Sequence, residues 1–215
     1  MTMTTEMVLK EVNDYLTNGN IKALEGLKTK LENELIEVQA KKLGKVTMLK
    51  VVKSIEKKLK TGWNGVGMGL IYNDSDTQTA FTDSHRLLVL NSSLGYERVT
   101  SNLGTLRLVN DCIASNTDTL TIDMDDLKKV YLLQKAVKAK DREFIYTFKF
   151  NETLPISFNT EWLLELLLAF ETDTIYVVPG KPLNTTLIKN KEGELALICP
   201  MPTPSDKGPW SNSNN

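Results

Sequence analysis

Residues 153–201 constrain the fold of this chain more than any other stretch. The segment 161–171 is hydrophobic almost all round at helical spacing, which predicts a helix largely covered by a sheet. Asn159 or Thr160 can cap this helix, because a short polar side chain accepts an otherwise unpaired N–H there. A strand that ends at Phe158 precedes the helix, and alternating patterns predict three strands after it, at residues 174–178, 185–189 and 195–199. This region is therefore predicted to be β-α-β-β-β.

Apolar spacing predicts further helices before this region. Residues 1–43 carry two helical patterns separated by a turn at Gly19, and Gly44 separates the second from a helix at 46–60. A fourth helix is expected at 126–139, capped by Asp123 or Asp125. The helix at 21–42 has an apolar stripe on one side, made of Leu24, Leu27, Leu31, Leu35 and Val38. Such a stripe packs on the rest of the chain, on a second copy, or in the groove of a partner.

The other predicted elements are strands. Alternation and β-branched content favour strands at 66–72, 77–91, 105–109, 119–124 and 144–150. The glycines between residues 62 and 69 lack the Gly-Lys-Ser/Thr ending of a phosphate loop, so we expect a turn there.

Composition favours an ordinary globular protein of the cytoplasm without catalytic chemistry. The 215 residues are 25% charged and 41% hydrophobic, and the N-terminus lacks the pattern of a signal peptide. The two cysteines, Cys112 and Cys199, are far apart, which is typical of a reducing compartment. His85 is the one histidine, so no histidine-based metal cluster is expected, and no cofactor is expected. A catalytic triad or paired-carboxylate pattern is absent, so an enzyme is not expected.

The charge is unevenly distributed, although the net charge is only −1. Residues 41–60 hold eight lysines against Glu56, and residues 128–142 hold five lysines and Arg142 against Asp141. The remainder of the chain is acidic. Two basic helices on an acidic body are either a solvated surface or a surface that contacts nucleic-acid phosphates.

Three segments, FTDSHRL (81–87), FNTEWLLELL (158–167) and ALICPM (196–201), form a pattern together. They resemble, in order, a strand, the start of the last helix and the closing strand of the bacterial DNA polymerase III β subunit, the sliding clamp. Ser84 stands where the clamp pattern has Gly, and this chain continues beyond Met201.

This resemblance implies an α+β fold with a DNA-clamp-like domain, in which helices pack on antiparallel sheets. We expect an N-terminal helical hairpin at 1–44, then the clamp-like domain at 45–203 with an insertion around 92–139, then a disordered tail at 204–215. The domain is expected to consist of two halves, near 45–90 and 140–203. A ring would then need several copies of the chain.

The resemblance also implies a processivity factor of DNA replication. Its expected partners are double-stranded DNA bound without sequence specificity, replication proteins, and further copies in a homo-oligomer, with no membrane. The lysines expected to contact DNA are Lys45, Lys50, Lys53, Lys57, Lys60, Lys128, Lys135, Lys138 and Lys140. The residues expected to bind a peptide motif, or else to serve only the core, are Thr82, Ser84, His85, Arg86, Leu87, Asn159, Trp162, Leu197, Cys199, Pro200 and Met201. The alternative is a clamp-fold protein-binding module, a phage or mobile-element adaptor or inhibitor, that does not encircle DNA.

Overall fold

The computed structural model describes residues 5–60, 71–73, 78–96, 104–137, 145–149, 155–181 and 183–201. The glycine-rich segment 61–70 and the expected tail at 204–215 lie outside the described residues. Within the described ranges the fold is mixed α+β, as the sequence predicts.

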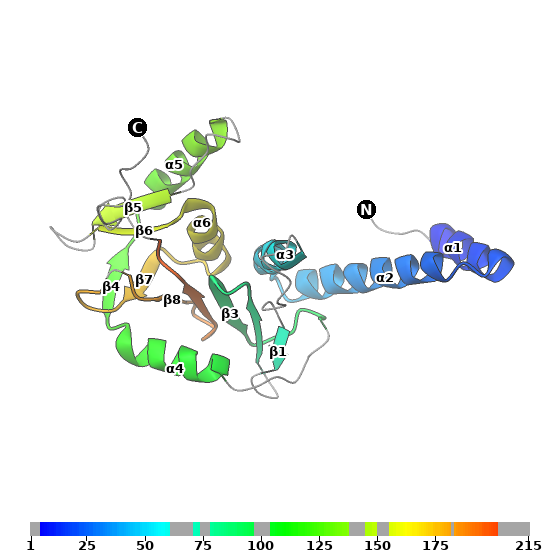
Figure 1. The fold of residues 1–215 in the computed structure, drawn as a ribbon, viewed down its shortest axis with the longest axis horizontal. Helices are drawn as coiled ribbons and strands as arrows, with labels where there is room; N and C mark the ends of the chain where they lie inside the picture. The colour runs from blue at the N-terminus through cyan, green and yellow to red at the C-terminus, as the bar shows by residue number, and fades with distance from the viewer. Residues whose placement is uncertain are drawn as a thin grey trace, which may run out of the picture.

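Among the described residues, a seven-stranded sheet forms the centre of the fold, in the order β1-β2-β3-β9-β8-β7-β4 (Figure 1). All neighbouring strands in it are antiparallel. The strands are β1 (Ile71–Asn73), β2 (Thr79–Thr82), β3 (Arg86–Leu90), β4 (Asp118–Thr121), β7 (Thr174–Val177), β8 (Thr186–Lys189) and β9 (Leu195–Ile198). A second antiparallel sheet pairs β5 (Ile145–Lys149) with β6 (Pro155–Asn159).

The helices are α1 (Thr5–Asn18), α2 (Ile21–Lys42), α3 (Val46–Lys60), α4 (Gly104–Ser115), α5 (Met124–Ala136) and α6 (Thr160–Ala169). Of these, α3 and α6 cover one face of the large sheet, and α4 covers the other. All five residues of β3 are buried, because side chains alternate between the faces of a strand and both faces are covered. Leu88 joins the main core with α3 and α6, while Leu87 joins a smaller core with Val109 and Cys112 of α4.

The sheet and its helices contain the same unit twice. A helix followed by three antiparallel strands occurs as α3-β1-β2-β3 and again as α6-β7-β8-β9. The last strands of the two units pair with each other, so that Leu88 lies opposite Ala196. The two helices also pack against each other on the same side of the sheet. The two units therefore share one sheet and the cores on both of its faces.

Three predicted strands differ from the structure. The strand predicted at 77–91 is two antiparallel strands, β2 and β3, separated by a turn at residues 83–85. Residues 105–109, predicted as a strand, belong to α4. Val109 and Cys112 are both buried, at the three-residue spacing with which a helix covers the second face of the sheet. The strand predicted at 119–124 ends at Thr121, because the Asp123 carboxylate accepts the N–H groups of Asp125 and Asp126 and starts α5 early.

The N-terminal hairpin consists of α1 and α2, joined at Gly19 with a φ of +61°. Figure 1 shows its far end projecting away from the sheet, while the last turns of α2 reach α3. Ile36 and Ala40 of α2 are buried in the main core. None of the helices in the described ranges is long and apolar enough to cross a membrane.

Ion pairs of the partly buried Lys45 fix the start of α3 to the turn between β8 and β9. The Lys45 ammonium lies 2.5 Å from a Glu194 carboxylate oxygen and 2.8 Å from one of Glu192. Burial by itself lowers the pKa of Lys45, but the hydrogen bonds and charges of the two glutamates outweigh it and raise that pKa. The Glu194 side chain is 1% exposed and also accepts the N–H of Asn91 at 2.9 Å. Lys45 is thus an internal structural cation.

The two glutamates offer a matched test of this ion pair. Glu194→Gln should lower the free energy of unfolding by about 3 kcal/mol, because it leaves the partly buried Lys45 charge with weaker compensation. Glu192→Gln should cost less than about 1 kcal/mol, because an exposed pair contributes little. Urea unfolding of both variants measures the difference, and equal costs would contradict the structural role of Glu194.

Candidate functional site

The turn between β2 and β3 carries the segment 81–87 and is built around Asp83. One carboxylate oxygen of Asp83 accepts the backbone N–H groups of His85 at 3.1 Å and Arg86 at 2.8 Å. Ser84 adopts a φ of +69°, in the left-handed region that glycine occupies at lower cost. The turn therefore has the backbone shape that the glycine of the clamp pattern would favour, with serine in its place.

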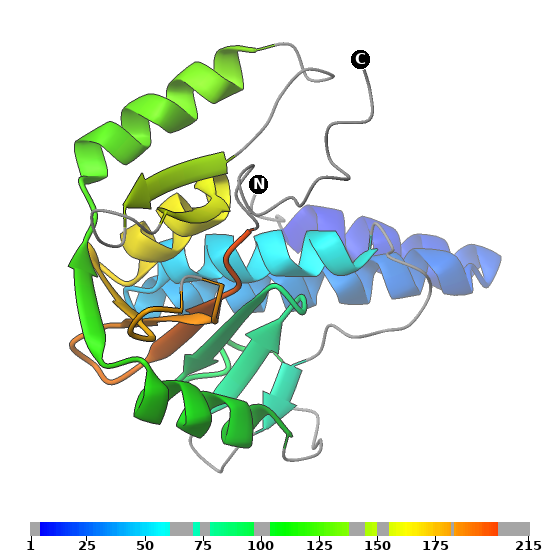
Figure 2. The same cartoon turned by 60° about the vertical axis from the view of Figure 1, so that its left-hand side comes forward.

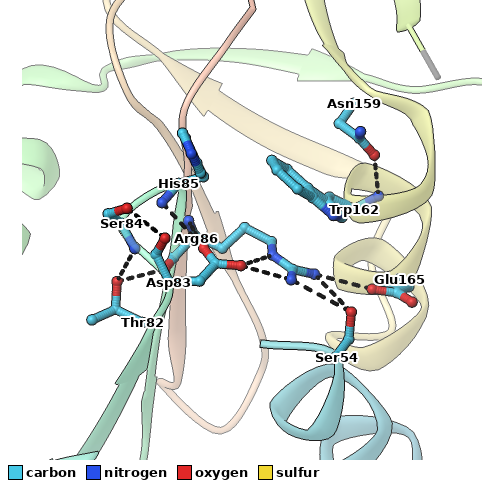
Figure 3. Close-up of polar contacts among 9 residues, drawn as sticks. All are labelled: Ser54, Thr82, Asp83, Ser84, His85, Arg86, Asn159, Trp162 and Glu165. Carbon is cyan, nitrogen blue, oxygen red and sulfur yellow. Dashed lines mark hydrogen bonds and ion pairs between the residues drawn. The ribbon is translucent and has the colours of Figure 1, made fainter. Parts of the chain in front are cut away.

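The Arg86 guanidinium is fully buried and connects three elements (Figure 3). It donates to the second Asp83 oxygen at 3.1 Å from Nε and 2.8 Å from Nη2. It also donates to Glu165 of α6 at 3.1 Å and lies 3.4 Å from the Ser54 hydroxyl of α3. A buried cation needs such partners, so these contacts fix the β2–β3 turn relative to both helices.

Trp162 lies against this cation at the first turn of α6. Its ring centroid is 4.8 Å from the Arg86 guanidinium carbon and 5.6 Å from the His85 ring, at an interplanar angle of 26° to the latter. The Asn159 side chain caps α6 by accepting the Trp162 N–H at 3.0 Å, which confirms one of the two caps predicted. The cap thus positions the ring next to the β2–β3 turn.

The closing strand leads into the same region. The Cys199 N–H donates to the His85 carbonyl at 2.9 Å, and the Met201 N–H donates to the Ser157 carbonyl of β6 at 2.7 Å. Cys199, Pro200 and Met201 are all partly exposed. The end of β9 therefore borders both the His85 turn and the β6–α6 segment.

The structure divides the expected peptide-binding residues into two groups. Thr82, Ser84, His85, Asn159, Trp162, Cys199, Pro200 and Met201 are exposed or partly exposed around the β2–β3 turn and the start of α6. Arg86 is buried within its carboxylate partners. Leu87 and Leu197 lie opposite each other in the β3–β9 ladder and belong to the smaller core under α4. These last three residues have a structural role in this protein.

The expected DNA-contacting lysines also divide. Lys45 and Lys53 are engaged by glutamates, the second by Glu37 at 2.7 Å, and the bond with Lys53 lowers the pKa of Glu37. Lys60 ends α3, and its side chain lies outside the described part of the chain, as do Lys138 and Lys140 entirely. Lys50, Lys57, Lys128 and Lys135 are exposed, and Lys128 also lies 3.5 Å from the exposed Asp125 carboxylate.

The helices α3, α6 and α5 pack side by side and form what we call the helical layer. The four exposed lysines lie in this layer, on either side of α6. Lys50 and Lys57 are seven residues apart, so they lie on one stripe of α3, between Lys53, which faces α2, and Ser54, which faces α6. Lys128 and Lys135 are likewise seven apart on α5, and Lys135 lies 3.2 Å from the Tyr131 hydroxyl. Tyr131 donates to Glu161 of α6 at 3.1 Å, which places this lysine stripe on the edge of α5 nearest α6.

Sequence reasoning missed several residues that organise this region. Asp83, Ser54 and Glu165 were not singled out, although an acid three residues before a buried arginine is a recognisable pair signal. Burial, the largest cause, raises the pKa of Glu165, and the charge of Arg86 acts in the opposite direction. In the described part of the chain, no group of three or more His, Cys, Asp or Glu residues is arranged to hold a metal ion.

Comparison of the chain with protein-family models, with curated proteins and with solved structures finds no match. The resemblance to the sliding clamp therefore rests on the three sequence segments.

The Arg86 contacts predict unequal costs for its two carboxylate partners. Asp83→Asn should destabilise the protein by about 3 kcal/mol, because it leaves a fully buried guanidinium short of one charge. Glu165→Gln should cost much less, under about 1 kcal/mol at neutral pH, since the Glu165 side chain is 33% exposed and burial disfavours its charged form. Thermal and urea unfolding of the two variants measure these costs. A larger cost for Glu165→Gln would contradict this ranking.

The raised pKa of Glu165 predicts a pH dependence of stability. The folded state holds this proton more tightly than the unfolded state, whose pKa is near 4.5. The stability that protonated Glu165 contributes to the folded state is therefore fully present below pH 4.5, and it is lost as pH rises through the folded pKa. Relative to the wild type, Glu165→Gln should consequently become more stable as pH rises above 4.5, as measured by unfolding at a series of pH values. A cost that grows over this window would contradict the direction of the shift.

Proposed function

We propose that this protein is a sliding-clamp-like accessory protein of DNA replication, whose helical layer contacts the DNA backbone. The observation that carries the proposal is the repeated unit of one helix and three strands. A clamp domain is similar, with two such halves side by side. The β3–β9 pairing and the packing of α3 on α6 join the halves in this chain. Fold likeness alone does not determine function, so the charges of the helical layer carry the next step.

The four exposed lysines of α3 and α5 support contact with DNA phosphates. They occupy the same side of the sheet as α6, on either side of it. The two acidic residues of α6 in this layer, Glu161 and Glu165, are hydrogen-bonded to Tyr131 and Arg86. Long lysine side chains contact phosphates without reading bases, which suits a protein that binds DNA of any sequence. As one clamp-like domain per chain is proposed, encirclement of DNA would need several copies.

A protein-binding role is the second candidate. The residues that surround the buried Arg86 at the surface, which we call the His85–Trp162 rim, favour it. His85 is exposed, Trp162 is partly buried, and Pro200 and Met201 are partly exposed beside them. Aromatic rings and methionine are enriched in protein interfaces. In this role the chain would be a clamp-fold module that binds a short motif of a replication protein, with or without DNA.

Reversal of the four lysines tests the DNA-binding proposal. Changing Lys50, Lys57, Lys128 and Lys135 to Glu should weaken binding to duplex DNA at least about tenfold at low salt. The slope of log K against log salt should fall by about 0.9 for each phosphate that the variant no longer neutralises. Fluorescence anisotropy at several salt concentrations measures both quantities.

A charge-matched control separates this surface from net charge. Lys10, Lys22, Lys181 and Lys191 are exposed elsewhere on the molecule, and reversing them changes the net charge equally. The control should retain more affinity and a steeper salt slope than the test variant. Equal losses in the two variants, or no loss in either, would overturn the proposed DNA surface and leave the protein-binding role.

A further inference from the structure

The N-terminal hairpin has a row of exposed apolar side chains, which we call the hairpin stripe. Its members are between 39% and 72% exposed, which is high for large aliphatic residues of a folded helix pair. They are Leu9 and Leu16 of α1 and Ile21, Leu24, Leu31, Leu35 and Val38 of α2.

Helix periodicity places these residues on one face of the hairpin. On α2, Leu24, Leu31 and Val38 repeat every seven residues, so they lie in line along the helix. On α1, Leu9 and Leu16 are also seven apart. When each helix is viewed from its own N-terminus, the exposed row is turned in the same direction away from the side that contacts the other helix. Because the helices are antiparallel, equal rotations bring both rows to the same face.

The rest of the chain leaves this face uncovered. The second half of α2 contacts the main core through Ile36 and Ala40, which point to another side of the helix. Leu27 is buried, at 4% exposed, unlike its stripe neighbours Leu24 and Leu31. Figure 2 shows the hairpin extending beyond the sheet and its covering helices. An exposed apolar face of this length marks an interaction surface.

We propose that the hairpin stripe binds the hairpin stripe of a second copy of this chain, with the two α2 helices antiparallel and a two-fold axis at Leu31. In this register Leu24 of one copy lies opposite Val38 of the other, and Leu31 meets its own copy. Lys28 and Glu32 lie together on the edge of the stripe that faces away from α1. The two-fold axis brings this edge of one copy against the same edge of the other, so that Lys28 lies about 3 Å along the helix axis from the level of Glu32 of the second copy. This gives the self-complementary charge pattern that a two-fold interface needs.

The size of the face fits a stable dimer. At 1.5 Å per residue and about 10 Å of width, the two helices present roughly 500 Å² per copy, or about 1,000 Å² in the pair. This total reaches the lower limit of specific protein interfaces, near 1,000 Å². The stripe is apolar at its centre and its edges carry both signs of charge, so a protein helix of matching pattern fits it better than an anionic surface does.

The dimer does not depend on the proposed function. Because α2 leads into α3 at its C-terminal end, the two sheet domains would lie at opposite ends of the paired hairpins. Each dimer would present two copies of the helical layer and of the His85–Trp162 rim.

Molar mass in solution tests the dimer directly. Light scattering after size exclusion, on the full chain at micromolar concentration, should give twice the mass of one chain. Leu31→Glu should raise the dissociation constant about a hundredfold or more, because the charge is placed at the centre of the interface twice. Leu132→Glu is the matched control, since Leu132 is a 64% exposed leucine on α5. A monomer at every concentration, or a dimer that persists in Leu31→Glu, would overturn the proposal.

Cysteine cross-linking tests the register. With a short bis-maleimide, Leu31→Cys should cross-link to itself, and a mixture of Leu24→Cys with Val38→Cys should cross-link more than either variant alone. Asn33→Cys lies near the same level but on the opposite side of α2, so it should remain at the background set by Cys112 and Cys199. Equal cross-linking of Leu31→Cys and Asn33→Cys would overturn the antiparallel pairing.

Discussion

The buried charge of Arg86 is the constraint on which the rest of the structure depends. A guanidinium in a protein core requires charged partners, and these partners come from different parts of the chain. Asp83 belongs to the same turn, Ser54 to α3, and Glu165 to α6. The two helix-and-three-strand units therefore meet around one cation. Trp162 covers that cation on the side that leads to the rim of the proposed binding region.

This arrangement connects the interior of the protein to its two proposed surfaces. The β3–β9 ladder makes one sheet from two units, and the packing of α3 on α6 makes one helical layer. The acidic residues of α6 bond to Arg86 and Tyr131, while lysine stripes of α3 and α5 remain exposed on either side. The distribution of charge, rather than the net charge of −1, gives the helical layer its proposed affinity for a polyanion.

The sequence predicted the elements with clear boundary signals. The helices 21–42 and 46–60 match α2 and α3, because Asn20 caps the first and Gly44, at a φ of +69°, separates them. The helix α4 was missed because its short apolar pattern, flanked by Ser and Asn, fits a strand as well as a helix. Only the sheet face that it covers distinguishes the two.

The roles of individual charged residues were less accessible from sequence. Lysines 45 and 50 are alike in the sequence, yet Lys45 is paired with Glu194, which lies some 150 positions away. Arg86 and Leu87 are neighbours in one motif, but they point to opposite faces of a sheet that is buried on both sides. Such assignments depend on long-range packing, which a local pattern does not contain.

Native-state hydrogen exchange across the described strands and helices is the most direct measurement of the claim that the two units form one body. The amides of β3 and β9, and those of α3 and α6, should exchange with a common free energy equal to that of global unfolding. Exchange of β9 and α6 at a much lower free energy than β3 and α3 would mean that the units open independently. That result would contradict an account in which Arg86 and the β3–β9 ladder join them.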